Sequence, residues 1–337
     1  MCHLSAGPGN AFCNYFASTW RHVVSRTPMF LVAAGMALCP AAHAFVTAAD
    51  FSGLESRIES RNINSPLGVA VDGSGNIYIA QSNGVLKETL SPDGSAYSET
   101  VVASFQGLKQ VGIAVDGVGN IYLGISGGVY KETLSDGSYS QTTVTSNVKQ
   151  PDWIAVDGKG NVYIADNANN RVLKETQSGD HYSQSVVLAP TTSGTNSLNG
   201  LAVDAAGNVY YVSGGDVWKS TPANGGYQSK LVLAGYYGRG LAVDGAGDLY
   251  VTTGSTQVLQ ETPSEGRYTQ STVATARLPI AAGLAVDYSG NLYVGDLEGK
   301  RVLKEYANSS PIRPLSSGSP GPAVSMLSAP DGSRTSH

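Results

Sequence analysis

The sequence predicts an all-β protein, a six-bladed propeller built from four-stranded antiparallel blades. The first observation is a stretch of 13 residues that recurs six times along the chain, at intervals of 40 to 47 residues, which is typical of repeat folds. The second is that each copy is followed by further short runs rich in β-branched and aromatic residues. No segment shows a sustained apolar period of 3.6 residues, so we expect almost no helix. The six copies begin at Gly68, Gly112, Trp153, Gly200, Gly240 and Gly283.

Each copy of the stretch predicts a β-hairpin. In the first copy, Asp72 follows a short apolar run, and Asn76 opens a second apolar run after a glycine at position 75. The aspartate can accept hydrogen bonds from turn amides, and the glycine supplies a residue with positive φ. The same aspartate recurs in every copy, far apart around a ring. We therefore interpret these aspartates as turn caps rather than as metal ligands.

Two more strands follow each hairpin. The predicted third strands are residues 85–89, 129–133, 172–176, 217–221, 258–262 and 302–306. The predicted fourth strands are residues 97–103, 139–145, 182–188, 227–233 and 268–274. The sixth repeat lacks a fourth strand of its own, and residues 54–61 precede the first repeat where such a strand would lie. We expect this N-terminal strand to close the ring; the alternative is residues 311–313, where flanking prolines disfavour ladder pairing.

The repeated charged and aromatic residues have structural interpretations. Lys-Glu dipeptides such as Lys87-Glu88 recur in the third strands and predict cross-strand charge pairs on solvated faces. A tyrosine recurs at one position of every copy, Tyr78 in the first, and predicts a packing layer between blades.

The repeat pattern Gly-x-Ala-Val-Asp-x-x-Gly-Asn-x-Tyr-x-Ala-Asp-x-x-Asn-x-Arg-Val resembles the NHL repeat, over roughly residues 54–306. The third repeat matches through Asp166 and Arg171, and the sixth keeps Asp296 and Arg301. The resemblance implies a six-bladed propeller, similar to the extracytoplasmic sensor propeller of bacterial receptor-type Ser/Thr kinases. We expect each Asp–Arg couple to form a structural ion pair that orders its loop.

The two ends of the chain differ from the repeats. Residues 1–44 carry an apolar run too short to span a bilayer, followed by Ala42-His43-Ala44, and predict a signal peptide cleaved after Ala44. The alternative for this segment is a buried or anchoring helix. Residues 45–306 form the predicted propeller. Residues 307–337 are rich in Ser, Pro and Gly and predict a disordered tail.

Composition narrows the class of protein. All three cysteines, Cys2, Cys13 and Cys39, lie in the predicted signal peptide, so the mature chain would have no disulfide and no thiolate metal site. The net charge of −5 disfavours nucleic-acid binding. We expect an exported monomer, periplasmic or extracellular, without a membrane span.

Catalysis finds little support in the sequence. Propeller lyases that resemble NHL proteins use central histidines with a metal, whereas the only histidines beyond residue 44 are His181 and His337. Gluconolactonase-type enzymes place Glu, Asn and Asp around a divalent cation at the central opening, where only Asn199 and Asp152 could serve here. We therefore expect a non-catalytic binding scaffold with no cofactor and no metal. The alternative is a metal-dependent lactonase- or lyase-like propeller enzyme.

The remaining candidate is a binding face. The links that lead from each fourth strand into the next blade crowd one face of such a propeller, and here they carry basic and aromatic residues. This composition suits a protein loop, a glycan or a small anionic ligand. The predicted ligand-binding residues are Trp153, Arg239, Tyr236, Tyr237, Asn199, Asp152, Lys109, Lys149 and Arg277.

Overall fold

The computed structural model describes residues 50–58, 62–93, 96–105, 107, 111–189, 198–253, 257–273, 278, 281–308 and 323–326. The chain divides into two compact units, residues 1–43 and 44–337, and every described residue belongs to the second. The predicted signal peptide therefore lies outside the described residues. In the described part of the chain, no helix is long and apolar enough to cross a membrane.

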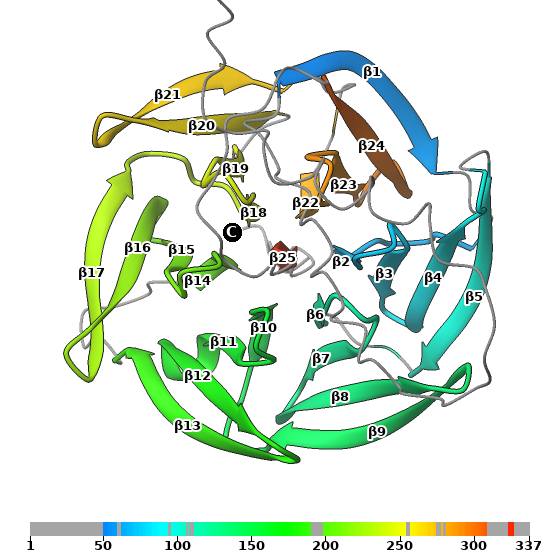
Figure 1. The fold of residues 1–337 in the computed structure, drawn as a ribbon, viewed down its shortest axis with the longest axis horizontal. Helices are drawn as coiled ribbons and strands as arrows, with labels where there is room; N and C mark the ends of the chain where they lie inside the picture. Colours follow the sequence, from blue (N-terminus) through cyan, green and yellow to red (C-terminus); the bar gives the residue numbers. More distant parts are fainter. Residues whose placement is uncertain are drawn as a thin grey trace, which may run out of the picture. The chain divides into compact units, whose positions relative to one another are not determined.

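The described residues form a six-bladed β-propeller whose blades are four-stranded antiparallel sheets, as the sequence predicts (Figure 1). The innermost strands surround the centre of the ring, and the fourth strands form its rim (Figure 1). Helix is confined, in the same residues, to one 3₁₀ turn, η1 (Asn167–Asn169).

The strands of the blades follow the repeats in order. Blade one contains β2 (Gly68–Val71), β3 (Ile77–Gln81), β4 (Gly84–Leu90) and β5 (Tyr97–Ser104). Blade two contains β6 (Gly112–Val115), β7 (Ile121–Ile125), β8 (Gly128–Ser135) and β9 (Ser138–Thr145). Blade three contains β10 (Pro151–Val156), β11 (Val162–Asp166), β12 (Arg171–Ser178) and β13 (His181–Leu188). Blade four contains β14 (Leu198–Val203), β15 (Val209–Ser213), β16 (Asp216–Ala223) and β17 (Gly226–Leu233). Blade five contains β18 (Leu241–Val243), β19 (Leu249–Thr252), β20 (Val258–Ser264) and β21 (Arg267–Thr272).

Blade six takes its outermost strand from the N-terminal side of the repeats. It contains β22 (Ala281–Val286), β23 (Leu292–Asp296), β24 (Arg301–Asn308) and β1 (Asp50–Ile58). β1 pairs with β24 in antiparallel register, from Asp50 opposite Asn308 to Ile58 opposite Val302. Ile58 is buried, so this end of the strand is anchored in the core.

One strand lies in the segment that the sequence predicts to be a disordered tail. β25 (Ala323–Met326) pairs with β2 on one side and with β22 on the other, at the centre of the ring (Figure 1). It joins blades one and six into one nine-stranded sheet. The physical reason is that an innermost strand has a free edge toward the centre, and even a short apolar segment can pair with such an edge. The composition of the tail gives no sign of this pairing.

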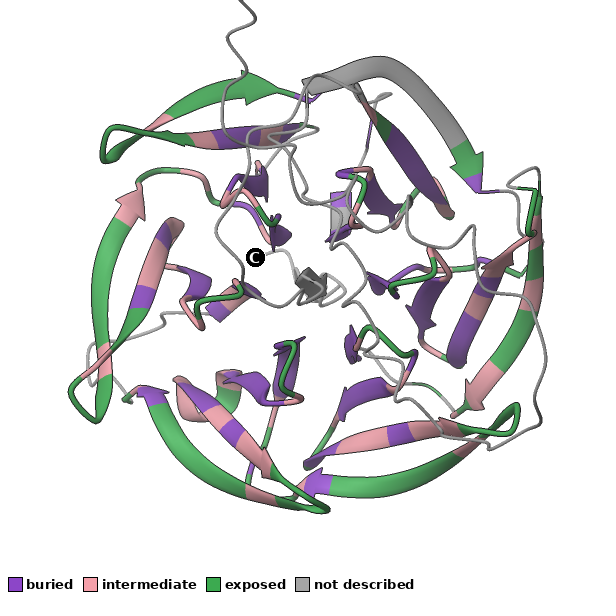
Figure 2. Cartoon of the chain, in the orientation of Figure 1, coloured by how far each residue is buried: buried purple, intermediate pink, exposed green. Residues whose placement is uncertain are grey.

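The core is built from the hairpins. In blades one to five, burial falls from the inner strands to the outer strand, and β9 and β13 are mostly exposed (Figure 2). In blade one, Asp72 Oδ1 accepts the N–H groups of Ser74 and Asn76, at 2.9 and 3.0 Å. Its Oδ2 accepts Asn76 Nδ2 at 2.7 Å and the Tyr78 hydroxyl at 3.0 Å. These contacts confirm that the aspartate caps the turn, and the tyrosine that it holds is fully buried.

The Lys-Glu dipeptides do not form solvated charge pairs. The glutamates are buried, and two of them accept a hydrogen bond from a glutamine of the paired fourth strand: Gln141 Nε2 donates to Glu132 at 2.6 Å and Gln184 Nε2 to Glu175 at 2.7 Å. The lysines lie on the other side of the strand, each with its Nζ 5.2–5.3 Å from the centre of the repeated tyrosine ring. The expectation was wrong because the faces of each blade pack against the neighbouring blades, and alternation alone does not show how deeply a face is covered. The glutamates concerned are Glu88, Glu132, Glu175 and Glu305.

Candidate functional site

The first candidate site is the central opening of the ring, called the mouth below. The sequence predicts that Trp153 lies there as a ligand-binding residue. The structure instead buries Trp153 completely, within the largest apolar cluster. β10 begins two residues before the repeated motif, and a register shift between Pro151 and Trp153 marks a bulge there. In blade two, added Cβ atoms at Gly112 and Gly124 would lie 2.7 and 2.3 Å from the Pro151 carbonyl oxygen. These glycines let blade three approach closely, which draws Trp153 into the core.

Asp152 lies in the same bulge and is buried. Its Oδ2 accepts Gln150 Nε2 at 2.9 Å and Asn167 Nδ2 at 2.6 Å. Burial raises the pKa of this carboxyl group to about 6, although the two amide donors oppose the shift. Asn167 also accepts the Leu198 N–H through Oδ1, at 2.9 Å. Asp152 therefore belongs to a hydrogen-bonded network that joins blades three and four.

Asn199 and Arg239 lie at the corresponding places of the next two blades, and both are partly buried. Gly200 adopts a positive φ of 60° at a bulge in β14, and an added Cβ would lie 3.0 Å from the Arg239 carbonyl oxygen. The Arg239 N–H donates to Thr252 Oγ1 at 2.9 Å. The structure thus brings Asn199 close to the backbone of Arg239 at the mouth.

The basic residues of the predicted face are only partly described. Lys149 is exposed, whereas Lys109 and Arg277 lie outside the described residues. The described residues contain no group of three or more His, Cys, Asp or Glu side chains placed to hold a metal ion.

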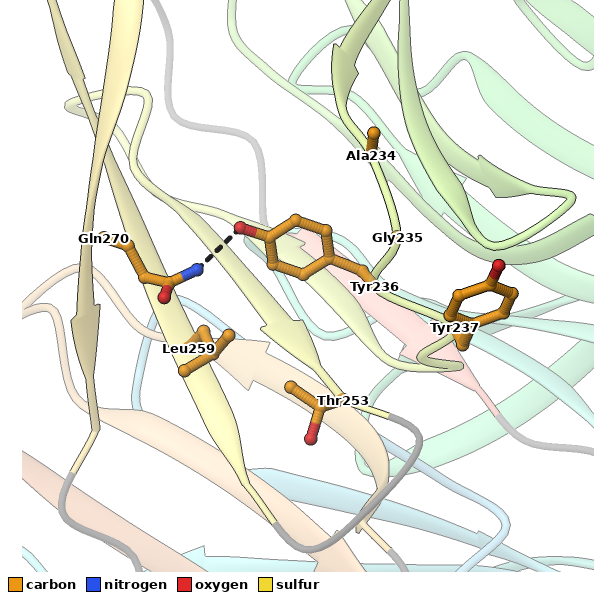
Figure 3. A pocket seen from close by; sticks show the side chains of 7 residues that line it. All are labelled: Ala234, Gly235, Tyr236, Tyr237, Thr253, Leu259 and Gln270. Carbon is orange, nitrogen blue, oxygen red and sulfur yellow. Dashed lines mark hydrogen bonds between the residues drawn. The ribbon is translucent and has the colours of Figure 1, made fainter.

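The second candidate site is a pocket of about 470 Å³ between blades four and five (Figure 3). It is formed by the link from β17 to β18 and by the facing strands of blade five. Its volume falls in the range typical of small-molecule sites, about 300–1,000 Å³. The seven lining residues are all uncharged: Ala234, Gly235, Tyr236, Tyr237, Thr253, Leu259 and Gln270.

Tyr236 joins the two blades beside this pocket. Its hydroxyl donates to Glu261, a buried residue of β20, and accepts Gln270 Nε2 at 2.7 Å (Figure 3). Burial and the bond to Glu261 raise the pKa of Tyr236 to about 12, so the phenol is neutral at physiological pH. In the link between blades two and three, Asn147 Nδ2 donates to the equivalent Gln184 at 3.0 Å. Tyr236 thus makes, in the link between blades four and five, the contact that the smaller Asn147 makes in the link between blades two and three.

Tyr237 is the exposed aromatic residue of the pocket. Its relative exposure is 72%, and its φ of 49° is in the left-handed region, which a bulky residue rarely adopts. The N–H groups of Tyr236 and Tyr237 both donate to the Gly215 carbonyl, at 2.8 and 3.0 Å. A Cβ added to Gly215 would lie 2.6 Å from the Tyr237 ring, so the ring rests directly on the backbone of the β15–β16 turn. The backbone bonds and the glycine fix an exposed ring in one place.

Sequence reasoning named the two tyrosines but missed their partners. Gln270 and Leu259 come from the outer strands of blade five, and Gly215 comes from a turn of blade four. The signal in the sequence is the Gly-Gly pair at positions 214–215, where the turns of equal length in blades one and two have Ser82-Asn83 and Ser126-Gly127.

Both expected ion pairs are present in the structure. Arg171 Nε lies 2.9 Å from Asp166 Oδ2, and Arg301 Nε lies 2.9 Å from Asp296 Oδ2. The two aspartates have no exposed side-chain surface, so these are not simple surface pairs.

Comparison with known proteins supports the fold. No family model matches the chain, so membership of the NHL family stays a prediction, and no curated protein matches either. Among solved structures, an auxiliary nutrient binding protein from Bacteroides ovatus aligns with a TM-score of 0.55 at 13% identity, over 79% of this chain and 76% of that chain. A gluconolactonase from Xanthomonas campestris aligns with a TM-score of 0.53 at 14% identity, over 78% of this chain and 99% of that chain. A streptogramin B lyase aligns with a TM-score of 0.52 at 13% identity, over 76% and 98%. At these identities the likeness shows the propeller fold alone, since one fold hosts many functions.

Proposed function

We propose that this protein is an exported, non-catalytic propeller of the NHL type that binds a ligand in the pocket between blades four and five. Export is supported by the signal-peptide pattern of residues 1–44. The NHL type is supported by the repeat pattern and by the six four-stranded blades of the described residues.

The observation that carries the proposal is the exposure of Tyr237 and its left-handed backbone conformation. Apart from its contact with Gly215, this large aromatic side chain is 72% exposed on a strained left-handed backbone, so it contributes little to the core. Amphipathic rings that are rigid before binding contribute contact area at low entropic cost, which is why they are common in binding sites. The pocket beside the ring offers the concave surface that a ligand requires.

The lining of the pocket favours an uncharged ligand. Two tyrosine rings offer apolar faces, while Gln270 and Thr253 carry groups that can hydrogen-bond to hydroxyl groups. A neutral glycan fits this mixture better than the small anionic ligand suggested by the basic links. Lys149 and Arg239 are not among the lining residues.

The test is glycan-array binding of the exported protein, followed by calorimetry with any glycan that binds. We expect Tyr237→Ala to reduce affinity at least tenfold, as for a central aromatic contact worth about 1.5–2 kcal/mol. Glu265→Ala is the matched control, because Glu265 is exposed at the same φ of 49° in the β20–β21 turn. It should leave affinity unchanged. Equal loss in both variants, or no loss in either, would exclude this pocket as the site.

The enzymatic alternative has its own measurement. Hydrolysis of a sugar lactone, or cleavage of a lyase substrate, that is abolished by a chelator would overturn the non-catalytic assignment. The residues to replace would then be Asp152 and Asn199 at the mouth, because their oxygen atoms suit a divalent cation.

A further inference from the structure

Blade five departs from the other five blades at two equivalent positions. The asparagine that ends the hairpin turn is replaced by Asp248, and the lysine that lies over the repeated tyrosine is replaced by Gln260. Relative to its neighbours, blade five has gained one acidic group and lost one basic group at the same place. The equivalent asparagines are Asn76, Asn120, Asn161, Asn208 and Asn291, and the equivalent lysines are Lys87, Lys131, Lys174, Lys219 and Lys304.

The other five blades show what this position does. In each of them the asparagine Nδ2 donates to Oδ2 of the turn aspartate, at 2.7–2.8 Å. The asparagine Oδ1 in turn accepts a backbone N–H in three blades, for example that of Leu134 onto Asn120 at 3.1 Å. The amide thus supplies a donor to the carboxylate and an acceptor to the third strand.

Blade five has neither the side-chain donor to the turn aspartate nor the third-strand N–H that donates to the asparagine in three other blades. A carboxylate at position 248 has no N–H to donate to Asp244, and the residue equivalent to Leu134 is Pro263, which has no N–H to donate to Asp248. Asp248 Oδ2 accepts Gln260 Nε2 at 2.8 Å, whereas its Oδ1 is buried and accepts no well-formed hydrogen bond among the described residues. The Thr262 side chain, together with Gln260, opposes the rise that burial causes in the pKa of Asp248. The exposed fractions of Asp244 and Asp248 are 5% and 1%. Two buried carboxylates beside one another cannot both stay ionised without a large cost.

We propose that Asp244 and Asp248 form a binding site for a single proton, which is held between the two carboxyl groups in mildly acidic solution and takes the place of the asparagine N–H. Protonation of one carboxyl group supplies the missing donor to the other. It also removes one of the two buried charges that no lysine neutralises in this blade.

The surroundings of the pair support this site. Asp244 Oδ1 accepts the N–H groups of Ala246 and Asp248, both at 2.9 Å, and Oδ2 accepts the Tyr250 hydroxyl at 3.1 Å. The other titratable group facing the pair in the described residues is Tyr268 on β21, and burial raises the pKa of both phenols, so they carry no charge at neutral pH. Burial, followed by the charge of Asp248, raises the pKa of Asp244 to about 7, and burial also raises the pKa of Asp248.

The sign of the pH effect follows from linkage. An unfolded aspartate has a pKa of about 3.9. Between about pH 4 and pH 7 the folded protein holds a proton that the unfolded chain has released, so stability falls as pH rises through this window. Above about pH 7 neither the folded protein nor the unfolded chain holds the proton, and the folded protein then bears the full free-energy cost of two buried charges. The site is therefore most destabilising in alkaline solution.

The test is the thermal unfolding midpoint of the full mature chain at pH 5 and pH 8. Asp248→Asn restores the amide of the other blades, and we expect it to raise the midpoint by at least about 2 °C at pH 8 and by clearly less at pH 5. Equal shifts at both pH values, or a lower midpoint at pH 8, would overturn the proposal. If added calcium or manganese raises the midpoint of the wild type at pH 8 but not that of Asp248→Asn, the site binds a metal cation rather than a proton.

A second set of variants builds the site in another blade. Asn120→Asp with Lys131→Gln gives blade two the two substitutions of blade five. We expect this double variant to lose stability at pH 8 and to recover much of it at pH 5, whereas Lys131→Gln alone should show no such difference. A pH-independent loss in the double variant would contradict the shared proton. Carboxyl-carbon NMR titration of Asp244 in the wild type should show a transition near neutral pH that Asp248→Asn moves toward acid.

Discussion

Arg171 donates from Nε to Asp166 at 2.9 Å, and it does so onto a carboxylate with no exposed surface. The same carboxylate accepts the backbone N–H groups of Lys149 and Gln150, at 3.0 and 3.2 Å, from the link that enters blade three. The ion pair is therefore one part of an anchor that fixes the incoming link. In blade five, Thr252 lies one position before the equivalent of Asp166, and its hydroxyl oxygen accepts the N–H groups of Arg239 and Gly240 at the entry to that blade.

We expect the two halves of this ion pair to differ in their effect on stability. Asp166→Ala removes the acceptor for two link N–H groups and leaves a guanidinium without its partner, and should lower the free energy of unfolding by about 3 kcal/mol. Arg171→Ala leaves a buried carboxylate that keeps the N–H groups of Lys149 and Gln150 and the amide of Asn169, and should cost less, about 1–2 kcal/mol. Urea unfolding of both variants measures the difference. Asp296→Ala and Arg301→Ala repeat the comparison in blade six, and equal losses within each pair would contradict the anchor role.

Trp153 should behave as a core residue. Its complete burial implies that Trp153→Ala opens a large cavity and lowers the free energy of unfolding by about 3–5 kcal/mol. Trp218 on β16 is only partly buried, and Trp218→Ala should cost clearly less. Thermal or urea unfolding of both variants checks this order. If Trp153→Ala lost ligand binding but kept its stability, Trp153 would be a binding residue and not a core residue.

The outermost strand of blade six should matter more than the central β25. Deleting residues 45–58 removes β1 and leaves β24 with an open edge, which favours pairing with other chains. We expect a lower melting temperature and concentration-dependent aggregation, followed by light scattering. Deleting residues 310–337 removes only the four-residue β25 and should have a smaller effect on both measurements. The reverse order would show that the C-terminal segment holds the ring together.

The buried carboxylates of blade three should respond to pH in opposite directions. Burial raises the pKa of Asp152 to about 6, so its contribution to stability is lost as pH rises from about 4 to about 6. Asp152→Asn should remove this loss of stability, which is on the order of 3 kcal/mol, from the pH profile.

Burial alone would raise the pKa of Asp166, but hydrogen bonds from Asn169, Lys149, Gln150 and Arg171 lower it overall. Its contribution is present above the unfolded pKa and is lost as pH falls through the lowered folded value. Asp166→Asn therefore serves as the control of opposite sign. Urea unfolding across pH 3–8 would distinguish the two, and parallel profiles for both variants would contradict these assignments.

The fold could be predicted from the sequence because each hairpin is specified locally. Asp72, Asn76 and Tyr78 lie within seven residues of one another and contact each other directly, so their spacing is visible in the chain. Six repetitions of that local pattern leave a propeller as the natural closed arrangement.

The candidate site could be predicted only in part. Tyr236 and Tyr237 are visible as aromatic residues in a link, but the partners Gly215 and Gln270 come from two different blades and meet them only through blade packing. Trp153 was expected at the surface because it replaces a glycine. A bulge in its own strand and two glycines of the neighbouring blade decide its burial, and the glycines belong to another repeat.

The pairing of β1 with β24 also has a consequence for biosynthesis. The ribosome makes β1 before any other strand of the ring and β24 after all the other strands of the six blades. β1 therefore remains unpaired during most of translation. Blades one to five contain their own four strands and can assemble from contacts that are close in sequence. Contacts between distant segments form slowly. An unpaired β1 on the growing chain is therefore the segment that a chaperone would need to shield until the last blade is complete.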